Sequence, residues 1–327
     1  MQLARRWLRK EQCPIRYFEE FVFKKRVKHV SGLTLDWLWK HAEEFGVSSE
    51  PEGENALLWQ VKHIVELMTM LTTLANHDIR GGTISKLTAR ALTHGAEFDW
   101  HQLAAYDASA ATVVAIVADF FACNQLPPPF EVEFVHFLHA IGFFEGMDRV
   151  PFREMDLAYS LSLMISPEFR KDLPVWFEST TFGQRQHLTR YTTDDIYSVT
   201  HAAFYLTNFG RNPLADLLDE ETAERLRKEL VALTVVVLRA DNIDVLGELL
   251  LSWLFCHVEN TFLNRMLFHQ AFERLLSATT PEGQVVPTMK LLQRAQSGET
   301  SFADVYHTTL VCCMVFAVAA KRMPYAG

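Results

Sequence analysis

One segment, from Tyr191 to Arg211, combines the residue types of a catalytic or binding site with the spacing of a helix. Its polar side chains recur every three or four residues, which places them in one stripe along a helix. They belong to Asp194, Ser198, His201, Tyr205 and Asn208. Aromatic residues accompany the stripe, and exposed surfaces seldom carry so many rings. The pattern therefore favours the polar wall of an internal cavity over an ordinary surface helix.

His201 lies in the middle of this stripe, one turn from Tyr197 and one turn from Tyr205. A helix would hold its imidazole rigidly enough for proton transfer, which makes His201 a candidate catalytic residue. The two tyrosines would shape a substrate pocket, with Asp194 and Asn208 as further substrate-binding groups. A core histidine that only hydrogen-bonds to a neighbouring helix is the alternative interpretation.

The acidic residues at the start of the same helix can also be explained by helix capping. Thr192 and Asp195 have the spacing of a capping box, in which two side chains satisfy the first backbone groups of a helix. Asp194 and Asp195 would then serve the helix end rather than a substrate.

A second pair of carboxylates, Asp244 and Glu248, is spaced by four residues and therefore shares one helix face. Leucines surround Glu248 in the sequence, so its carboxylate must be paired, hydrogen-bonded or protonated. Desolvation raises the pKa of a carboxyl group, and a general acid near neutral pH needs such a raised pKa. We predict that these two residues are catalytic, as acid or orienting carboxylates. A structural pairing with an Arg, His or Tyr of another helix is the alternative.

Metal sites and cofactor motifs are poorly represented. Cys256 and His257 are adjacent, as in the zinc site of lanthionine cyclases, and His136 and His139 are three residues apart. Neither spacing selects a coordination geometry, and the phenylalanines beside His136 and His139 predict core packing. TTDD at positions 192–195 resembles the acidic motif of terpene cyclases but lacks its first Asp. We expect no metal and no cofactor.

Nucleotide and serine-hydrolase motifs are also missing from the sequence. There is no P-loop, no dinucleotide-binding glycine motif and no G-x-S-x-G. These observations disfavour chemistry that depends on ATP, on a nicotinamide or on an activated serine.

Long helical patterns dominate the chain, and extended alternating strands are hard to find. Four segments are apolar nearly all round and need cover on several sides: residues 113–123, 230–238, 246–255 and 310–320. A single layer of helix pairs would leave one face of each helix open, whereas two concentric layers would cover the inner helices. We therefore predict an all-α fold, an α/α toroid of helix pairs, with a curved helical-repeat solenoid and an irregular bundle as alternatives.

The chain as a whole has the composition of a soluble globular protein. It has 327 residues, of which 49% are hydrophobic and 22% charged, and we expect one domain over residues 1–327. The net charge of -9 argues against general nucleic-acid binding. A basic arm over residues 1–30, with nine Lys and Arg against three Glu, could contact an acidic partner or a membrane. A solvated helix face is the alternative there.

The sequence has no signal-peptide pattern, because mixed aromatic and charged residues follow its basic start. The longest apolar run, Leu310 to Ala320, is shorter than the about 20 residues that cross a bilayer, so we expect no membrane span. Five cysteines, an odd number within apolar segments, fit a reducing cytoplasm.

The run from Thr200 to Gly210, THAAFYLTNFG, resembles the signature T-H-x-x-F-Y-x-T-D-F-G of a family of bacterial all-helical proteins of unassigned function. Asn208 stands where that signature has Asp, and Asp244 with Glu248 adds support. The resemblance implies a toroid-like helical protein, often encoded beside genes of specialised metabolism. It implies no reaction.

These observations lead to two hypotheses. In the first, inner helices enclose an aromatic-lined pocket for a small, partly apolar metabolite or peptide-derived intermediate. His201 would transfer a proton beside Glu248 and Asp244, in a cofactor-independent cyclisation, isomerisation or hydrolysis. In the second, the protein is a non-catalytic helical scaffold that binds another protein of the same pathway through its concave face and basic arm.

Overall fold

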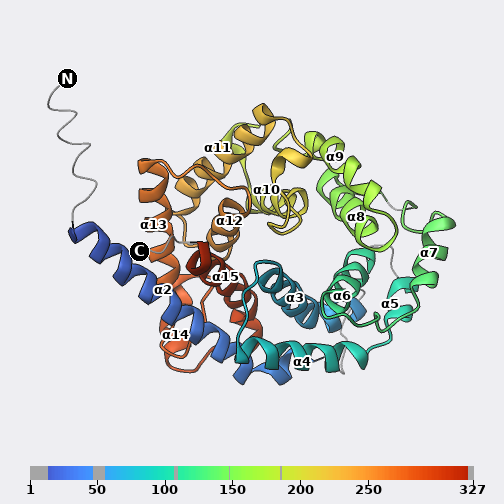
Figure 1. The fold of residues 1–327 in the computed structure, drawn as a ribbon, viewed down its shortest axis with the longest axis horizontal. Coiled ribbons are helices and arrows are strands. Elements are labelled where there is room, and N and C mark those ends of the chain that lie inside the picture. The colour runs from blue at the N-terminus through green and yellow to red at the C-terminus, as the bar shows by residue number, and fades with distance from the viewer. Residues whose placement is uncertain (1–13, 47–55, 107–109, 147, 185, 323–327) are drawn as a thin grey trace.

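The computed structural model describes residues 14–46, 56–106, 110–146, 148–184 and 186–322 (Figure 1). These residues form helices joined by short loops, and their β-structure is limited to one isolated bridge between Thr279 and Val285. The prediction of an all-helical protein is confirmed. The helices are α2 (Pro14–Lys40), α3 (Ala56–Asn76), α4 (Gly82–Ala96), α5 (Trp100–Tyr106), α6 (Ala111–Cys123), α7 (Val132–Ala140), α8 (Pro151–Met164), α9 (Leu173–Ser179), α10 (Thr193–Leu206), α11 (Glu220–Val237), α12 (Ile243–Phe255), α13 (Phe262–Ser277), α14 (Leu292–Gln296) and α15 (Phe302–Arg322).

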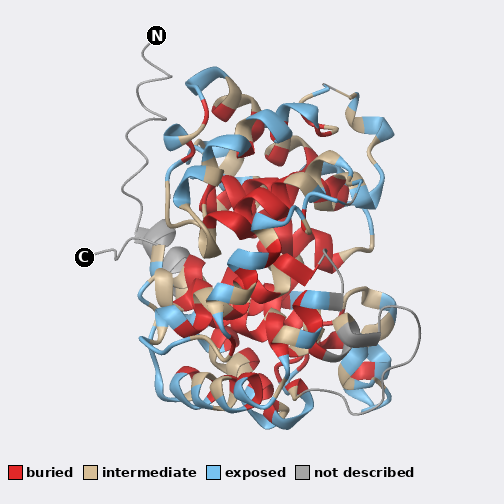
Figure 2. Cartoon of the chain, turned by 90° about the vertical axis from the view of Figure 1, so that its right-hand side faces the viewer, coloured by how far each residue is buried: buried red, intermediate tan, exposed pale blue. Residues whose placement is uncertain are grey.

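Helices α3, α6, α8, α10, α12 and α15 contact one another in this order, and α15 returns to contact α3. Figure 1 shows these helices around the middle of the molecule, with α2, α4, α5, α7, α9, α11, α13 and α14 outside them. Buried residues concentrate in the inner helices and exposed residues on the outer ones (Figure 2). The double layer explains how segments that are apolar nearly all round find cover on several sides.

Helix α15 is the one described helix that is long and apolar enough to cross a membrane. It is longer than the apolar run of the sequence, because residues 302–309 extend it at its start. Helices α2, α3 and α12 pack against it, and 78% of its most apolar window is buried inside the protein. The protein core therefore accounts for its apolar composition.

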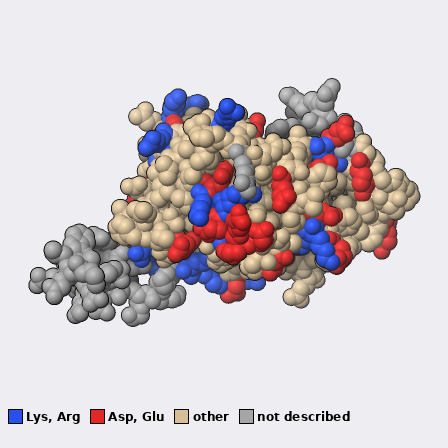
Figure 3. Space-filling view, turned by 90° about the horizontal axis from the view of Figure 1, so that it is seen from above, with Lys and Arg blue, Asp and Glu red and all other residues tan. Residues whose placement is uncertain are grey.

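The basic arm expected over residues 1–30 falls largely outside the described residues, which begin at Pro14. The described part of the arm is the first half of α2. Arg26 in this half forms an ion pair with Glu273 of α13, with 2.7 Å between Nη1 and Oε2. On the face drawn in Figure 3, basic side chains lie in small groups beside acidic ones, so the described residues of that face present no continuous basic surface to a nucleic acid.

Helices α12 and α15 approach each other closely at Gly247. A Cβ atom at this position would lie 3.0 Å from Cγ1 of Val311 and 3.4 Å from Sγ of Cys312. Gly247 lies between Asp244 and Glu248 in α12, and Val311 is one turn after His307 in α15. The small residue therefore brings His307 alongside the two carboxylates.

Replacing Gly247 with Val is expected to lower the free energy of unfolding by about 1 to 3 kcal/mol, because the added methyl groups overpack the contact with α15. Thermal unfolding measures this loss. Gly32→Val is the matched control, since a Cβ atom at Gly32 in α2 would meet nothing within 4 Å. Equal stability of the two variants would contradict the close packing at Gly247.

Candidate functional site

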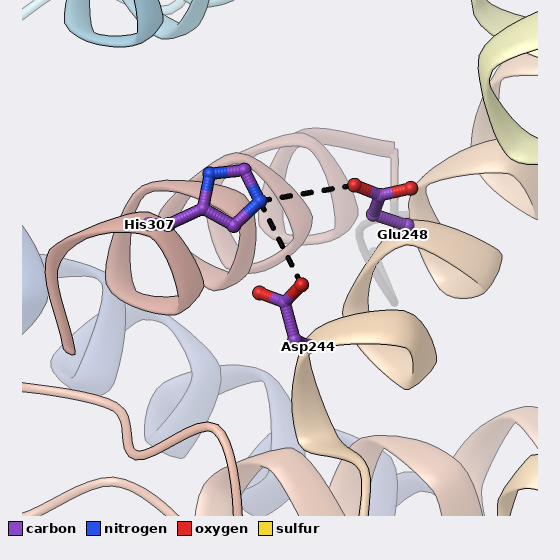
Figure 4. Close-up of side chains that lie close together, drawn as sticks. All are labelled: Asp244, Glu248 and His307. Atoms are coloured by element: carbon purple, nitrogen blue, oxygen red, sulfur yellow. Dashed lines mark ion pairs between the residues drawn. The ribbon is translucent and has the colours of Figure 1, made fainter. Parts of the chain in front are cut away.

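Five ionisable side chains from four inner helices converge on one region of the ring. Glu66 comes from α3, His201 from α10, Asp244 and Glu248 from α12, and His307 from α15. Figure 4 shows three of them, with the imidazole of His307 facing the carboxylates of Asp244 and Glu248. We call these five residues the carboxylate–histidine cluster.

Asp244 and Glu248 lie on the same face of α12, as their spacing predicts. Asn242 caps this helix by accepting a hydrogen bond from the backbone N–H of Val245. Asp244 is then the second residue of the helix, where the helix dipole stabilises a negative charge. Both carboxylates are buried, with exposed fractions of 7% for Asp244 and 2% for Glu248.

Hydroxyl groups donate some of the hydrogen bonds that these two carboxylates can accept. Tyr197 donates to Oδ2 of Asp244 at 2.6 Å, and Thr308 donates to Oδ1 at 2.8 Å. Thr200 donates to Oε2 of Glu248 at 2.5 Å. The alternative of a structural pairing with other helices is therefore partly realised, since these donors come from α10 and α15.

His307 connects the three carboxylates of the cluster. Its Nδ1 lies 3.0 Å from Oε2 of Glu66, and its Nε2 lies 3.6 Å from Oδ2 of Asp244 and 3.9 Å from Oε1 of Glu248. Burial lowers the pKa of His307, but the charges of Glu66 and Asp244 and the neighbouring hydrogen bonds outweigh burial and raise this pKa well above its usual value.

His201 approaches the same carboxylate from the other side. Its Nε2 lies 3.8 Å from Oε1 of Glu248, and its Nδ1 is buried without a hydrogen-bond partner among the described residues. Burial lowers the pKa of His201, but the charge and hydrogen bond of Glu248 and the charge of Asp156 together outweigh burial, so the pKa lies above its usual value. About a third of each histidine side chain remains exposed, 32% for His201 and 37% for His307.

The expected direction of the pKa of Glu248 was wrong. Burial does raise this pKa, but His201 and His307 together act more strongly and lower it to about 2. This direction favours the ionised form of Glu248, which suits an orienting carboxylate better than a general acid. The sequence showed its leucine neighbours but not the two imidazoles from other helices.

The other residues of the polar stripe have separate surroundings. Tyr205 donates to Asp156 of α8, which also forms an ion pair with Arg153 at 2.6 Å. Asp194 is exposed in the first turn of α10, and its charge helps to raise the pKa of Tyr197. Asn208 lies beyond the end of α10, where it accepts a hydrogen bond from Tyr159 at 2.9 Å.

The capping interpretation at the start of α10 is confirmed for Thr192 and Asp195, which form a complete capping box. Core packing was wrong for His136, which is exposed and contacts the carbonyl of Met164 at 3.1 Å. His139 is half-buried beside Glu145. The structure also describes a pocket away from the carboxylate–histidine cluster, lined by Thr69, Thr72, Thr73, Asn76, Ile116, Asp119, Tyr159, Leu163, Phe209 and Arg211.

Two members of the cluster, Glu66 and His307, were not identified from the sequence. Neither belongs to a recognisable motif of its helix, and the two are 241 positions apart. The one signal at His307 is the polar run from His307 to Thr309 before the buried half of α15. That run could have indicated a polar contact inside the core.

Glu248→Gln is expected to lower the free energy of unfolding by about 3 kcal/mol at neutral pH, because it leaves two histidines beside a neutral amide. The pKa of Glu248 is about 2 in the folded protein and about 4.3 in an unfolded chain. Its contribution to stability is therefore present above pH 4.3 and is lost as the pH falls towards 2.

Urea unfolding of both proteins at pH 7 and pH 3, with a chelator present, measures this difference. Glu273→Gln is the control, since a partly exposed ion pair contributes about 1 kcal/mol or less. A difference between wild type and Glu248→Gln that stays constant over this pH range would show that the carboxylate is not held ionised by the histidines.

Comparisons with known proteins place the chain in a family without assigning an activity to it. No curated protein matches the chain. The model of the family described as "Domain of unknown function (DUF6895)" matches residues 31–317, a range that contains the whole carboxylate–histidine cluster. The resemblance to a family of unassigned function is thereby supported in its coarse form, and the chain belongs to the DUF6895 family.

Proposed function

We propose that the protein is an acid–base enzyme that binds a small, partly apolar molecule beside His201 and His307. The observation that carries the proposal is that two partly exposed imidazoles from different helices meet one buried, ionised carboxylate, Glu248. A proton-transfer group needs access to the substrate, and an orienting carboxylate needs protection from water. The histidines and Glu248 have these two properties respectively.

His201 would transfer the proton in this proposal. Its Nε2 faces Glu248, which would hold the ring in place and stabilise its charged form. Because the pKa of Glu248 is low, this residue would act as the orienting carboxylate and not as the acid. Asp244, which accepts the hydroxyl of Tyr197, would play a similar orienting part towards His307.

The aromatic rings around His201 support a partly apolar ligand. Ring centroids of Tyr197, Phe204 and Tyr205 lie 6.1, 5.9 and 6.2 Å from that of the imidazole. Such a surface suits a metabolite or peptide-derived intermediate that undergoes cyclisation, isomerisation or hydrolysis. Asp194, near Tyr197 at the start of α10, would contact polar parts of the ligand.

The wider setting of the proposal is an α/α toroid in the cytoplasm of a bacterium, within specialised metabolism. The closed order of contacts among the inner helices supports the toroid over the open solenoid. The four described cysteines, Cys123, Cys256, Cys312 and Cys313, are free thiols, in keeping with a reducing compartment.

A non-catalytic interaction protein is the second candidate, and one surface favours it. Phe262, Leu263 and Met266 at the start of α13 are half or more exposed. Exposed apolar residues that adjoin on one helix are typical of a protein-binding surface. A pathway protein would be the partner in that case.

Replacing His201 with Asn is expected to reduce turnover by about 100-fold or more, because proton transfer by a positioned side chain contributes this much to a reaction. The substrate is sought by incubating the protein with a small-molecule extract of its native host and recording which masses disappear or form. His136→Asn, at an exposed histidine of α7, is the matched control.

The proposal requires that the wild type and His136→Asn convert a component of the extract and that His201→Asn, folded as judged by circular dichroism, does not. Equal conversion by all three proteins would remove His201 from the mechanism. No conversion by the wild type, together with loss of a co-purified protein in a Phe262→Asp variant, would favour the interaction protein.

A further inference from the structure

We infer that Asp244, Glu248 and His307 form a binding site for a divalent first-row transition-metal ion. The site was not expected from the sequence, and its existence does not depend on the proposed proton transfer. The argument rests on the donor atoms, on their outer partners and on the charge of the region.

The donor atoms surround a common point without bonding to one another. One ligand atom from each of Asp244, Glu248 and His307 lies within 4.8 Å of the others. Nε2 of His307 is 3.6 Å from Asp244 and 3.9 Å from Glu248, and Figure 4 shows all three groups turned inward. These separations exceed hydrogen-bond length but match two ligands that each bind one ion at about 2.0 to 2.2 Å.

His201 lies beside this set on α10. Its Nε2 lies 3.8 Å from Oε1 of Glu248, the same oxygen that faces His307. One imidazole nitrogen and two carboxylate oxygens would face the ion from two helices, and His201 would remain available for proton transfer. Donor sets of this mixed kind suit Zn²⁺, Fe²⁺ or Mn²⁺, whereas Mg²⁺ prefers oxygen donors alone.

The outer partners of these residues leave the proposed ligand atoms available. Glu66 holds Nδ1 of His307 at 3.0 Å, which directs Nε2 towards the carboxylates. This carboxylate–histidine arrangement is the usual support of a metal-bound imidazole. Thr200 binds Oε2 of Glu248 and leaves Oε1 directed at the proposed ion. Oδ2 of Asp244 accepts the hydroxyl of Tyr197 at 2.6 Å and would bind the ion through its second lone pair.

The negative charge of the region also favours the binding of a cation. Glu66, Asp244 and Glu248 bring three carboxylates to one place, and two of them are buried. Without an ion, protons on His201 and His307 would have to balance this charge. A divalent ion would replace the proton on His307 and bind its neutral imidazole directly.

Purification without chelator, followed by elemental analysis, is the first test. We expect about one equivalent of a first-row metal per chain. After removal of the metal with a chelator, addition of Zn²⁺ or Mn²⁺ should raise Tm, because an ion that binds only the folded state stabilises it. Mg²⁺ at the same concentration should raise Tm less.

Variants of the full chain then locate the ion by calorimetric titration with Zn²⁺. His307→Ala should abolish stoichiometric binding. Glu66→Gln, which leaves every ligand in place, should weaken binding by about 10- to 100-fold through the lost support of the imidazole. His257→Ala is the matched control, and binding should be unchanged because His257 does not belong to the cluster.

Unchanged Zn²⁺ binding in His307→Ala, or loss of binding in His257→Ala alone, would overturn the assignment. Absence of any stoichiometric metal binding by the wild type would overturn it as well. These outcomes are separate from the test of His201 in turnover, since a metal-free protein could still require His201 for proton transfer. Co²⁺ absorption in the visible range gives a check for variants of low stability, because its bands should change between wild type and Glu66→Gln.

Discussion

The placement of three carboxylates between the inner helices, with Asp244 and Glu248 buried and Glu66 partly buried, is the constraint on which the site depends. Moving an ionised carboxylate out of water raises the free energy of the folded state by roughly several kcal/mol unless other groups pair with it or donate hydrogen bonds to it. Glu66, Asp244 and Glu248 obtain these groups from different helices, as hydroxyls and imidazoles. The electrostatic requirement thus ties α3, α10, α12 and α15 together at one place, and no one of these helices can satisfy it alone.

Most residues of α12 and α15 that follow the cluster are apolar, and their packing positions the cluster. In α12 the residues after Glu248 are buried as far as Trp253, and in α15 Thr308 and the residues up to Ala319 are buried. Apolar packing along these stretches holds the two helices in register, with Gly247 allowing the close approach to Val311. The polar groups can therefore meet with defined distances, since the packed segments leave little freedom for sliding.

The segment from Thr200 to Gly210 serves two regions of the molecule. Its first residues, Thr200 and His201, contact Glu248 in the cluster. Its last residues form a turn with three consecutive positive φ angles, from Asn208 to Gly210. A Cβ atom on Gly210 would lie 2.5 Å from the ring of Phe255, so the turn needs glycine for both conformation and space. The end of this segment therefore shapes a turn, whereas its start contributes side chains to the cluster.

The sequence alone determined the helical class and the first half of the site. Long stretches of apolar periodicity predict helices. A carboxylate among leucines, such as that of Glu248, indicates that it has hydrogen-bond or charge partners in the folded protein. The partners themselves were decided by tertiary structure: His307 and Glu66 are 241 positions apart, and no local pattern connects them. Tertiary structure also decided whether the pKa of Glu248 is raised or lowered. The burial that raises it can be inferred from neighbouring residues in the sequence, whereas the histidines that lower it come from other helices. Distances between side chains on separate helices follow from packing, so only the folded chain could bring two imidazoles and three carboxylates into one cluster.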